Sequence, residues 1–142
     1  MKRTVLIDTG PLVAFLNGKD MHHKWVVEQL KQITPPLLTC EAVIAEACWL
    51  LRMTPAGIDN IMELFQREVL SISFPFQLET ENIRRIMKKY HDLPTSLADA
   101  CLVRMAEIHD NSTVLTLDSD FRVYRKSNRR TIPVLMPNRK NM

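Results

Sequence analysis

The sequence predicts a single α/β domain with a mostly parallel central sheet of about five strands and helices on both faces. A chain of 142 residues with 46% hydrophobic content is large enough to bury one compact core. Short β-rich apolar runs alternate along it with longer segments whose apolar residues recur at helical spacing. Strands that alternate with helices in this way pair in parallel through right-handed crossovers.

The chain begins with the element around which we expect the fold to be built. A β-rich run over residues 4–7 ends at Asp8, and Gly10 and Pro11 then indicate a change from strand to helix. This order places the Asp8 carboxylate at the carboxyl end of a strand, the edge at which open α/β sheets bind their ligands. A short helix over 12–16 should follow and end at Asn17.

Apolar spacing and proline breaks define the remaining elements. We expect helices over 22–33, 41–52, from 54 onward, 79–90 and 97–109, and strands over 37–40, 69–73, 113–117 and 131–135. The adjacent His22 and His23 would point about 100° apart on a helix, which argues against a metal-binding pair.

Two of these helices carry an acid among apolar residues. The segment 41–52 is apolar almost all round, which predicts a helix inside the core, yet it contains Glu46. Asp99 has similar surroundings in the segment 97–109. Because a bare buried charge costs several kcal/mol, each acid needs a cation, a basic partner or a proton. Two such acids in one small domain suggest a shared cation.

A further acid, Asp118, follows the strand predicted over 113–117, although turn and N-cap chemistry explains an aspartate there equally well. If the first and fourth strands are neighbours, Asp8 and Asp118 meet at one crevice, with Glu46 and Asp99 facing it from flanking helices. Four mutually repelling carboxylates favour a hard cation, Mg²⁺ or Mn²⁺. The chain has no convincing Ser-His-Asp or Cys-His set, so the expected nucleophile is a metal-activated water.

Basic residues are distributed unevenly, although the net charge is only +3 and the pI about 8.9. Residues 79–90 carry a basic helical face that is either an ordinary solvated surface or part of a nucleic-acid footprint. After Asp120 every charged side chain is basic, which forms either a solubilising tail over about 122–142 or an attraction for phosphates. The residues of the face and of the tail are Arg84, Arg85, Lys88 and Lys89, and Arg122, Arg125, Lys126, Arg129, Arg130, Arg139 and Lys140. Acids that hold a metal, with basic residues around them, fit phosphodiester hydrolysis.

The chain resembles a known family, the PIN domains, and especially the ribonuclease toxins of bacterial VapBC toxin–antitoxin modules. The likeness covers nearly the whole chain. It comprises Val5-Leu6-Ile7-Asp8-Thr9, Val43-Ile44-Ala45-Glu46, Leu97-Ala98-Asp99-Ala100 and Leu115-Thr116-Leu117-Asp118-Ser119-Asp120-Phe121, in that order.

The resemblance implies metal-dependent cleavage of single-stranded RNA, with Mg²⁺ or Mn²⁺ as the cofactor. It assigns the metal site to Asp8, Glu46, Asp99 and Asp118, with Asp120 as a second-choice ligand, and the surrounding hydrogen bonds to Thr9 and Thr116. Family members commonly form homodimers, and the toxins are blocked by an antitoxin peptide laid over the site.

Two other classes of protein remain as alternatives. Asp8-Thr9-Gly10 after an apolar strand is also the pattern of aspartic proteases, but those are β-structures, whereas Pro11 and periodic helices follow here. A PIN-like domain could also bind RNA or a protein without cleaving it, and the presence of all four acids argues against that reading.

The cysteines bear on the cellular compartment. Cys40, Cys48 and Cys101 are odd in number and lie in apolar runs, which favours free thiols in a reducing compartment over a disulfide or zinc framework. We find no leader-like start and no apolar stretch near the roughly 20 residues that cross a bilayer. We therefore expect a cytoplasmic protein without a membrane segment.

Overall fold

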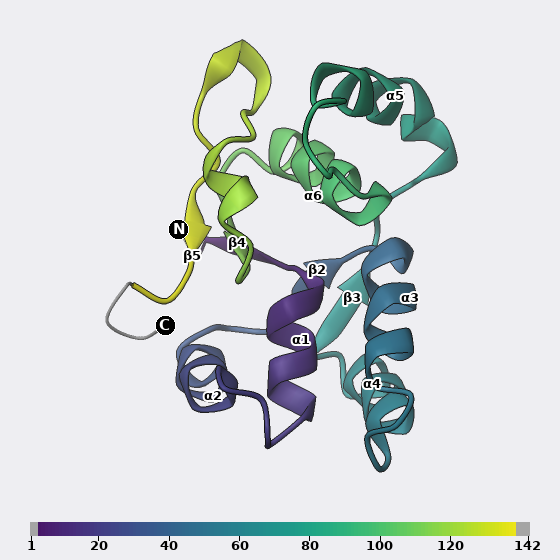
Figure 1. Cartoon of the computed structure of the whole chain (residues 1–142), viewed down its shortest axis with the longest axis vertical. Helices are drawn as coiled ribbons and strands as arrows, with labels where there is room; N and C mark the ends of the chain where they lie inside the picture. Colours follow the sequence, from purple (N-terminus) through teal and green to yellow (C-terminus); the bar gives the residue numbers. More distant parts are fainter. Residues whose placement is uncertain (1–2, 139–142) are drawn as a thin grey trace.

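The computed structural model describes residues 3–138, and its elements follow the predicted order (Figure 1). The strands are β1 (Thr4–Ile7), β2 (Leu37–Thr39), β3 (Leu70–Ile72), β4 (Ser112–Leu115) and β5 (Val134–Leu135). The α-helices are α1 (Thr9–Leu16), α2 (His23–Lys31), α3 (Glu41–Leu50), α4 (Gly57–Gln66), α5 (Thr80–Lys89) and α6 (Leu97–Ile108). Short 3₁₀ segments are η1 (Gln77–Glu79), η2 (Ser119–Arg122) and η3 (Ser127–Arg129).

The five strands form one sheet in the order β3-β2-β1-β4-β5, and every pair is parallel. This confirms the predicted fold class and the pairing of the first strand with the fourth. In the register, Ile7 of β1 lies opposite Leu115 of β4, so the two strands end side by side. Asp8, which follows Ile7, is therefore brought next to the segment that follows β4.

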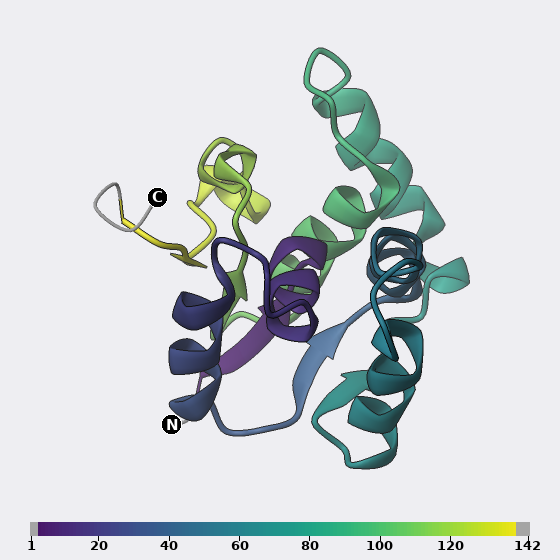
Figure 2. The same cartoon turned by 60° about the horizontal axis from the view of Figure 1, so that its bottom comes forward.

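Each face of the sheet has its own apolar core because successive strand residues point to opposite faces. Leu6 of β1 packs in the core formed with α5 and α6, whereas Val5 and Ile7 pack in the core formed with α1 and α4. In Figure 1, α5 and α6 lie towards the top, and α2 and α4 lie towards the bottom. Figure 2 shows the same arrangement turned by 60°.

Helix capping explains where the two helices nearest the site begin. Asp8 is the N-cap of α1 and accepts a hydrogen bond from the Thr9 backbone N–H, so this helix begins earlier than the predicted residue 12. Ser96 is the N-cap of α6, and its side chain and that of Asp99 form a reciprocal capping box. Both caps fix an acid at the start of a helix.

The prediction that α3 is buried on all sides is wrong. Within the helix only Val43 and Ala47 are buried, and each belongs to a different core. Trp49 and Leu50 are 64% and 56% exposed, and Glu46 is exposed as well. The helix therefore lies where the two cores meet, and its outer side is open although it is apolar.

Part of the predicted basic tail is folded. Lys126 is buried, and its Nζ donates to the backbone oxygen of Asp110 over 3.1 Å. The Arg130 guanidinium donates to Oδ1 of the same residue over 3.0 Å. Arg139 and Lys140 lie outside the described residues, and none of the helices within residues 3–138 is long and apolar enough to cross a membrane.

Candidate active site

The four predicted acids line one cavity of about 600 Å³ at the carboxyl ends of β1 and β4. They come from four parts of the fold: the β1–α1 junction, α3, α6 and the segment after β4. The lining residues are Asp8, Thr9, Gly10, Glu46, Leu50, Pro94, Ser96, Asp99, Leu117, Asp118 and Ser119. The structure thus brings Asp8, Glu46, Asp99 and Asp118 around the same space.

Like Asp99, Asp8 is buried, with 7% of its surface exposed. Its Oδ1 accepts from the Thr9 backbone N–H and its Oδ2 from the Thr116 hydroxyl, both over 2.7 Å. Burial raises the pKa of this carboxyl from its ordinary 3.8 to about 6; the two hydrogen bonds oppose the shift, and the charges of Asp99 and Asp118 add to it. A cation in the cavity would stabilise the ionised form of Asp8, because its positive charge offsets the effects of burial and of the neighbouring acids.

The segment after β4 is hydrogen-bonded to Thr116 as well. The Asp118 backbone N–H donates to Thr116 Oγ1 over 3.0 Å, and Asp118 Oδ1 accepts from the Asp120 backbone N–H over 2.9 Å. Asp118 is therefore both a cavity-lining acid and the N-cap of η2. Asp120 supplies the turn and is not among the lining residues.

Asp99 is held at the other side of the cavity. Its Oδ2 accepts from the Tyr124 hydroxyl over 3.0 Å and from the Ser96 backbone N–H over 3.3 Å. Burial raises the pKa of Asp99 above its ordinary value, and the negative charge of Asp118 adds to the rise. Tyr124 was not among the site residues predicted from the sequence.

Glu46 differs from the other acids because its side chain is exposed, so the expectation that it emerges among buried apolar groups is wrong. Its pKa is nevertheless raised, first by partial desolvation and then by the charge of Asp99. Glu46 therefore lines the cavity from the exposed side of α3.

Within residues 3–138, no group of three or more acid, histidine or cysteine side chains stands ready-made as a metal site. The four carboxylates line the cavity, but they are not close enough together to form a preformed metal site. Thr9 Oγ1, at the cavity wall, is buried and has no hydrogen-bond partner in this part of the chain. An unpartnered buried hydroxyl beside several carboxylates fits a position for a bound water or ion.

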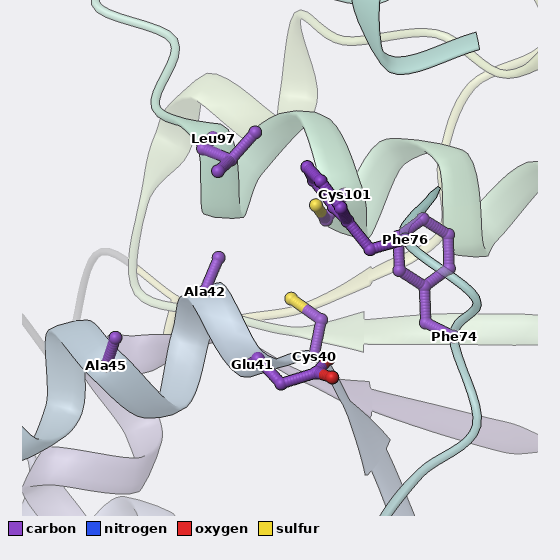
Figure 3. A pocket seen from close by; sticks show the side chains of 8 residues that line it. All are labelled: Cys40, Glu41, Ala42, Ala45, Phe74, Phe76, Leu97 and Cys101. Carbon is purple, nitrogen blue, oxygen red and sulfur yellow. The ribbon is translucent and has the colours of Figure 1, made fainter. Parts of the chain in front are cut away.

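A second cavity of about 360 Å³ lies between α3 and α6 and is almost entirely apolar (Figure 3). Phe74, Phe76 and Leu97 line it, and the side chains of Cys40 and Cys101 point towards one another from its two sides. All three cysteines are free thiols, as predicted, although Cys48 is only half-buried. None of the four acids lines this space, so the acid chemistry belongs to the first cavity.

The predicted basic residues differ in how strongly they are engaged. Arg84, Lys88 and Lys89 are exposed on α5, which we call the α5 basic face. Arg85 instead forms an ion pair with Glu107 over 2.9 Å. Arg125 is half-buried, and its guanidinium donates to backbone oxygens of residues 122–124, whereas Arg122 is exposed.

Comparison with known proteins identifies the family to which this fold belongs. The family model of the PIN domain matches residues 5–127, which includes every acid described above. The chain belongs to the PIN domain family. Ribonuclease VapC26 from Mycobacterium tuberculosis (strain ATCC 25618 / H37Rv) is 30% identical to this PIN domain over 118 residues, which cover 80% of the chain and 86% of the relative.

A solved structure has the same fold. The crystal structure of Mycobacterium tuberculosis VapC20, described as a Sarcin-Ricin loop cleaving toxin, superposes with a TM-score of 0.71 at 18% identity. The superposition covers 84% of this PIN domain and 94% of the VapC20 chain. The sequence and fold comparisons together make this PIN domain VapC-like, as the sequence motifs predicted.

Proposed function

We propose that this PIN domain is a divalent-metal-dependent ribonuclease that hydrolyses phosphodiester bonds of single-stranded RNA. The observation that carries the proposal is the cavity lined by four acids, of which Asp8 and Asp99 are buried. A relative that covers most of the chain carries the name ribonuclease, which supports the same activity.

The residues at the cavity fit Mg²⁺ or Mn²⁺ as the cofactor. All candidate ligands are carboxylate oxygens, the donors that these hard cations prefer. Burial and mutual repulsion raise the pKa of Asp8, Glu46 and Asp99, and a nearby cation would relieve both effects. Asp8, Glu46, Asp99 and Asp118 would hold the ion, with Asp120 as the second choice. When bound, such an ion supplies activation of water and charge neutralisation at the phosphate.

The protein's own groups then position the acids. Thr116 and the Thr9 backbone N–H hold the two oxygens of Asp8, so its carboxylate keeps one orientation. Tyr124 and Ser96 hold Asp99 in the same manner. Leu50 and Leu117 supply apolar walls, which lower the local dielectric and strengthen the electrostatic interactions of the site.

The α5 basic face and the exposed Arg122 would contact the phosphates of the RNA. α5 leads directly into the segment that contains Pro94 and Ser96, both of which line the acid cavity. Arg85 and Arg125 bind within the protein and would contribute less to RNA than the sequence suggested.

The partners that we propose follow from the VapC-like family membership. They are an antitoxin protein that covers the acid cavity and a second copy of the chain in a homodimer. We place this toxin in the cytoplasm, where three free cysteines stay reduced.

A second candidate is a PIN domain that binds RNA or a protein without cleaving it. One observation favours it: the acids do not converge into a ready-made metal site within residues 3–138. The two candidates differ in whether RNA is cut when metal is added.

The test is a titration of Mg²⁺ or Mn²⁺ into the protein with a fluorescent single-stranded RNA, repeated in excess chelator. A nuclease releases short fragments only with metal, and Asp8→Asn abolishes the release. Asp59→Asn, which changes an exposed acid on α4, is the matched control and should cleave like the wild type. Binding without fragments would support the non-catalytic candidate, and full cleavage in chelator would exclude the metal mechanism.

A further inference from the structure

Tyr124 lies in an unusual place for a phenol. It is fully buried, and its ring packs edge to face against Tyr90 at 4.9 Å and Phe121 at 5.1 Å between ring centroids. Its hydroxyl is 3.0 Å from Oδ2 of Asp99 and 3.1 Å from the hydroxyl oxygen of Thr95. The ring is thus part of the core, while its polar end reaches an acid of the cavity.

The single hydroxyl proton of Tyr124 goes to the better acceptor. A carboxylate is a stronger acceptor than a neutral hydroxyl, so Tyr124 donates to Asp99. Thr95 has its own acceptor, since its hydroxyl is 3.3 Å from the backbone oxygen of Tyr90. The bond from Tyr124 therefore restrains the Asp99 carboxylate at Oδ2, the same oxygen that the Ser96 backbone N–H binds.

Tyr124 also links two of the cavity's acids through the backbone. Its N–H donates to the backbone oxygen of Asp120 over 3.1 Å, and the Asp120 N–H donates to Asp118 Oδ1 over 2.9 Å. One side of the residue is thus fixed to the turn that holds Asp118, and the other side is fixed to Asp99 on α6. A buried aromatic residue thus connects the two acids through hydrogen bonds.

We propose that Tyr124 is a positioning residue, which holds the Asp99 carboxylate in the orientation required to bind the divalent cation. The proposal rests on the proposed function, in which Asp99 is a metal ligand. Groups that hydrogen-bond to a metal-ligating carboxylate typically change metal affinity 10–100-fold when they are removed.

The test compares Tyr124→Phe with Tyr90→Phe by titration calorimetry with Mn²⁺ alone. Both changes remove one buried phenol hydroxyl from the same aromatic cluster. The Tyr90 hydroxyl, however, accepts from the Arg125 backbone N–H over 2.8 Å and bonds to no acid among residues 3–138. We expect the Kd for Mn²⁺ to rise about 10–100-fold in Tyr124→Phe and to stay within about twofold of the wild type in Tyr90→Phe.

A double variant tests whether the effect passes through Asp99. Asp99→Asn should weaken Mn²⁺ binding by itself. Adding Tyr124→Phe to it should change the Kd by no more than about twofold further, because the carboxylate that the Tyr124 hydroxyl orients is no longer present. Thermal melts in chelator report the structural cost of each hydroxyl separately, and these costs should be similar in the two tyrosine variants.

The outcomes separate this proposal from the function on which it rests. An unchanged Kd for Mn²⁺ in Tyr124→Phe overturns the proposal. An equal loss of Mn²⁺ affinity in Tyr124→Phe and Tyr90→Phe also overturns it, because either result gives Tyr124 a purely structural role. If Mn²⁺ binds the wild type and supports RNA cleavage, those failures concern Tyr124 alone. Absence of Mn²⁺ binding to the wild type would instead overturn the metal mechanism together with this proposal.

Discussion

The hydroxyl of Thr116 donates to Oδ2 of Asp8 over 2.7 Å, joining the end of β4 to the end of β1. The same hydroxyl oxygen accepts from the Asp118 backbone N–H over 3.0 Å. One buried threonine thus connects two acids that are 110 positions apart, and the parallel pairing of β1 with β4 makes this connection possible.

Thr116→Val tests this connection. Valine keeps the shape but leaves Asp8 Oδ2 and the Asp118 N–H without their partner, so we expect a loss of about 1–3 kcal/mol in the free energy of unfolding. We also expect Mn²⁺ to bind about 10–100-fold more weakly. Urea denaturation and calorimetry measure the two effects.

Thr39→Val is the matched control for that variant. Thr39 is fully buried at the end of the neighbouring strand β2, and its hydroxyl donates to the backbone oxygen of Ile7 over 3.0 Å. It should cost stability but leave Mn²⁺ affinity unchanged. Similar affinities in the two threonine variants would show that Thr116 supports only the fold.

The raised pKa of Asp8 predicts how stability depends on pH. Because its pKa is about 6 in the folded protein and 3.8 ordinarily, the folded state holds the proton more tightly than the unfolded state. This contribution to stability is complete below about pH 4 and is lost as the pH rises through about 6. Between pH 4.5 and 7.5, the metal-free protein should lose about 2 kcal/mol through Asp8.

Asp8→Asn removes this titration. In chelator, the variant should therefore lose about 2 kcal/mol less than the wild type over the same pH range. Urea unfolding at both pH values gives the comparison. Parallel pH profiles for the two proteins would show that Asp8 ionises normally in the folded state.

Asp99→Asn distinguishes a metal ligand from a structural acid. Asparagine keeps an oxygen acceptor for Tyr124 but removes a charge that repels Asp118, so the metal-free variant should be at least as stable as the wild type. Added Mn²⁺ should stabilise the wild type in proportion to RT ln(1 + [L]/Kd), and the variant much less. Thermal melts of both proteins, with chelator and with metal, provide the four values. An equal loss of stability in both conditions would argue for a structural role.

RNA affinity should fall with salt, and the α5 basic face should account for part of the slope. For single-stranded RNA, each phosphate contact contributes roughly 0.7 to the slope of log affinity against log salt, so replacing Arg84 and Lys88 by Gln should lower it by about 1.4. Fluorescence anisotropy with a labelled RNA measures the change. Replacing the exposed Lys19, which precedes α2, and the exposed Lys24, which lies in α2, by Gln should leave the slope unchanged. Equal slopes in all proteins would make the face an ordinary solvated surface.

The fold was largely predictable because strand and helix periodicities alternate clearly along the chain. The pairing of β1 with β4 followed from a general property of parallel sheets, and it brought Asp8 next to Asp118 without any contact information. The start of α1 was misplaced because Asp8 acts as its N-cap, so the strand passes into the helix without a turn.

The surroundings of Glu46 were not predictable from local pattern. α3 is apolar almost all round, which normally indicates burial, but only Val43 and Ala47 are fully buried. Ala42, Ile44 and Cys48 pack against the cores while partly exposed. Hydrophobicity alone cannot distinguish a helix inside one core from a helix at the boundary of two. The exposed Trp49 and Leu50 follow from that position.

Tyr124 was missed for a different reason. Its hydrogen bond to Asp99 joins residues that are 25 positions apart, and no spacing rule connects the segment after η2 to the start of α6. The available signal was chemical, because the hydroxyl of a tyrosine needs a hydrogen-bond partner when it is buried. Lys126 was placed in a basic tail that would either aid solubility or attract phosphates. Its contact with Asp110 was missed because it depends on how the chain folds back.

The central claim is that water attacks the RNA phosphate at a site assembled from these acids. Mass spectrometry of the ends formed when the wild type cleaves a single-stranded RNA with Mn²⁺ tests this claim most directly. Attack by water leaves a linear phosphate that contains one oxygen from the solvent, visible in ¹⁸O-labelled water, and does not require the neighbouring 2′-hydroxyl. A 2′,3′-cyclic phosphate end without solvent oxygen would show that the RNA's own 2′-hydroxyl is the nucleophile, and this result would contradict the account.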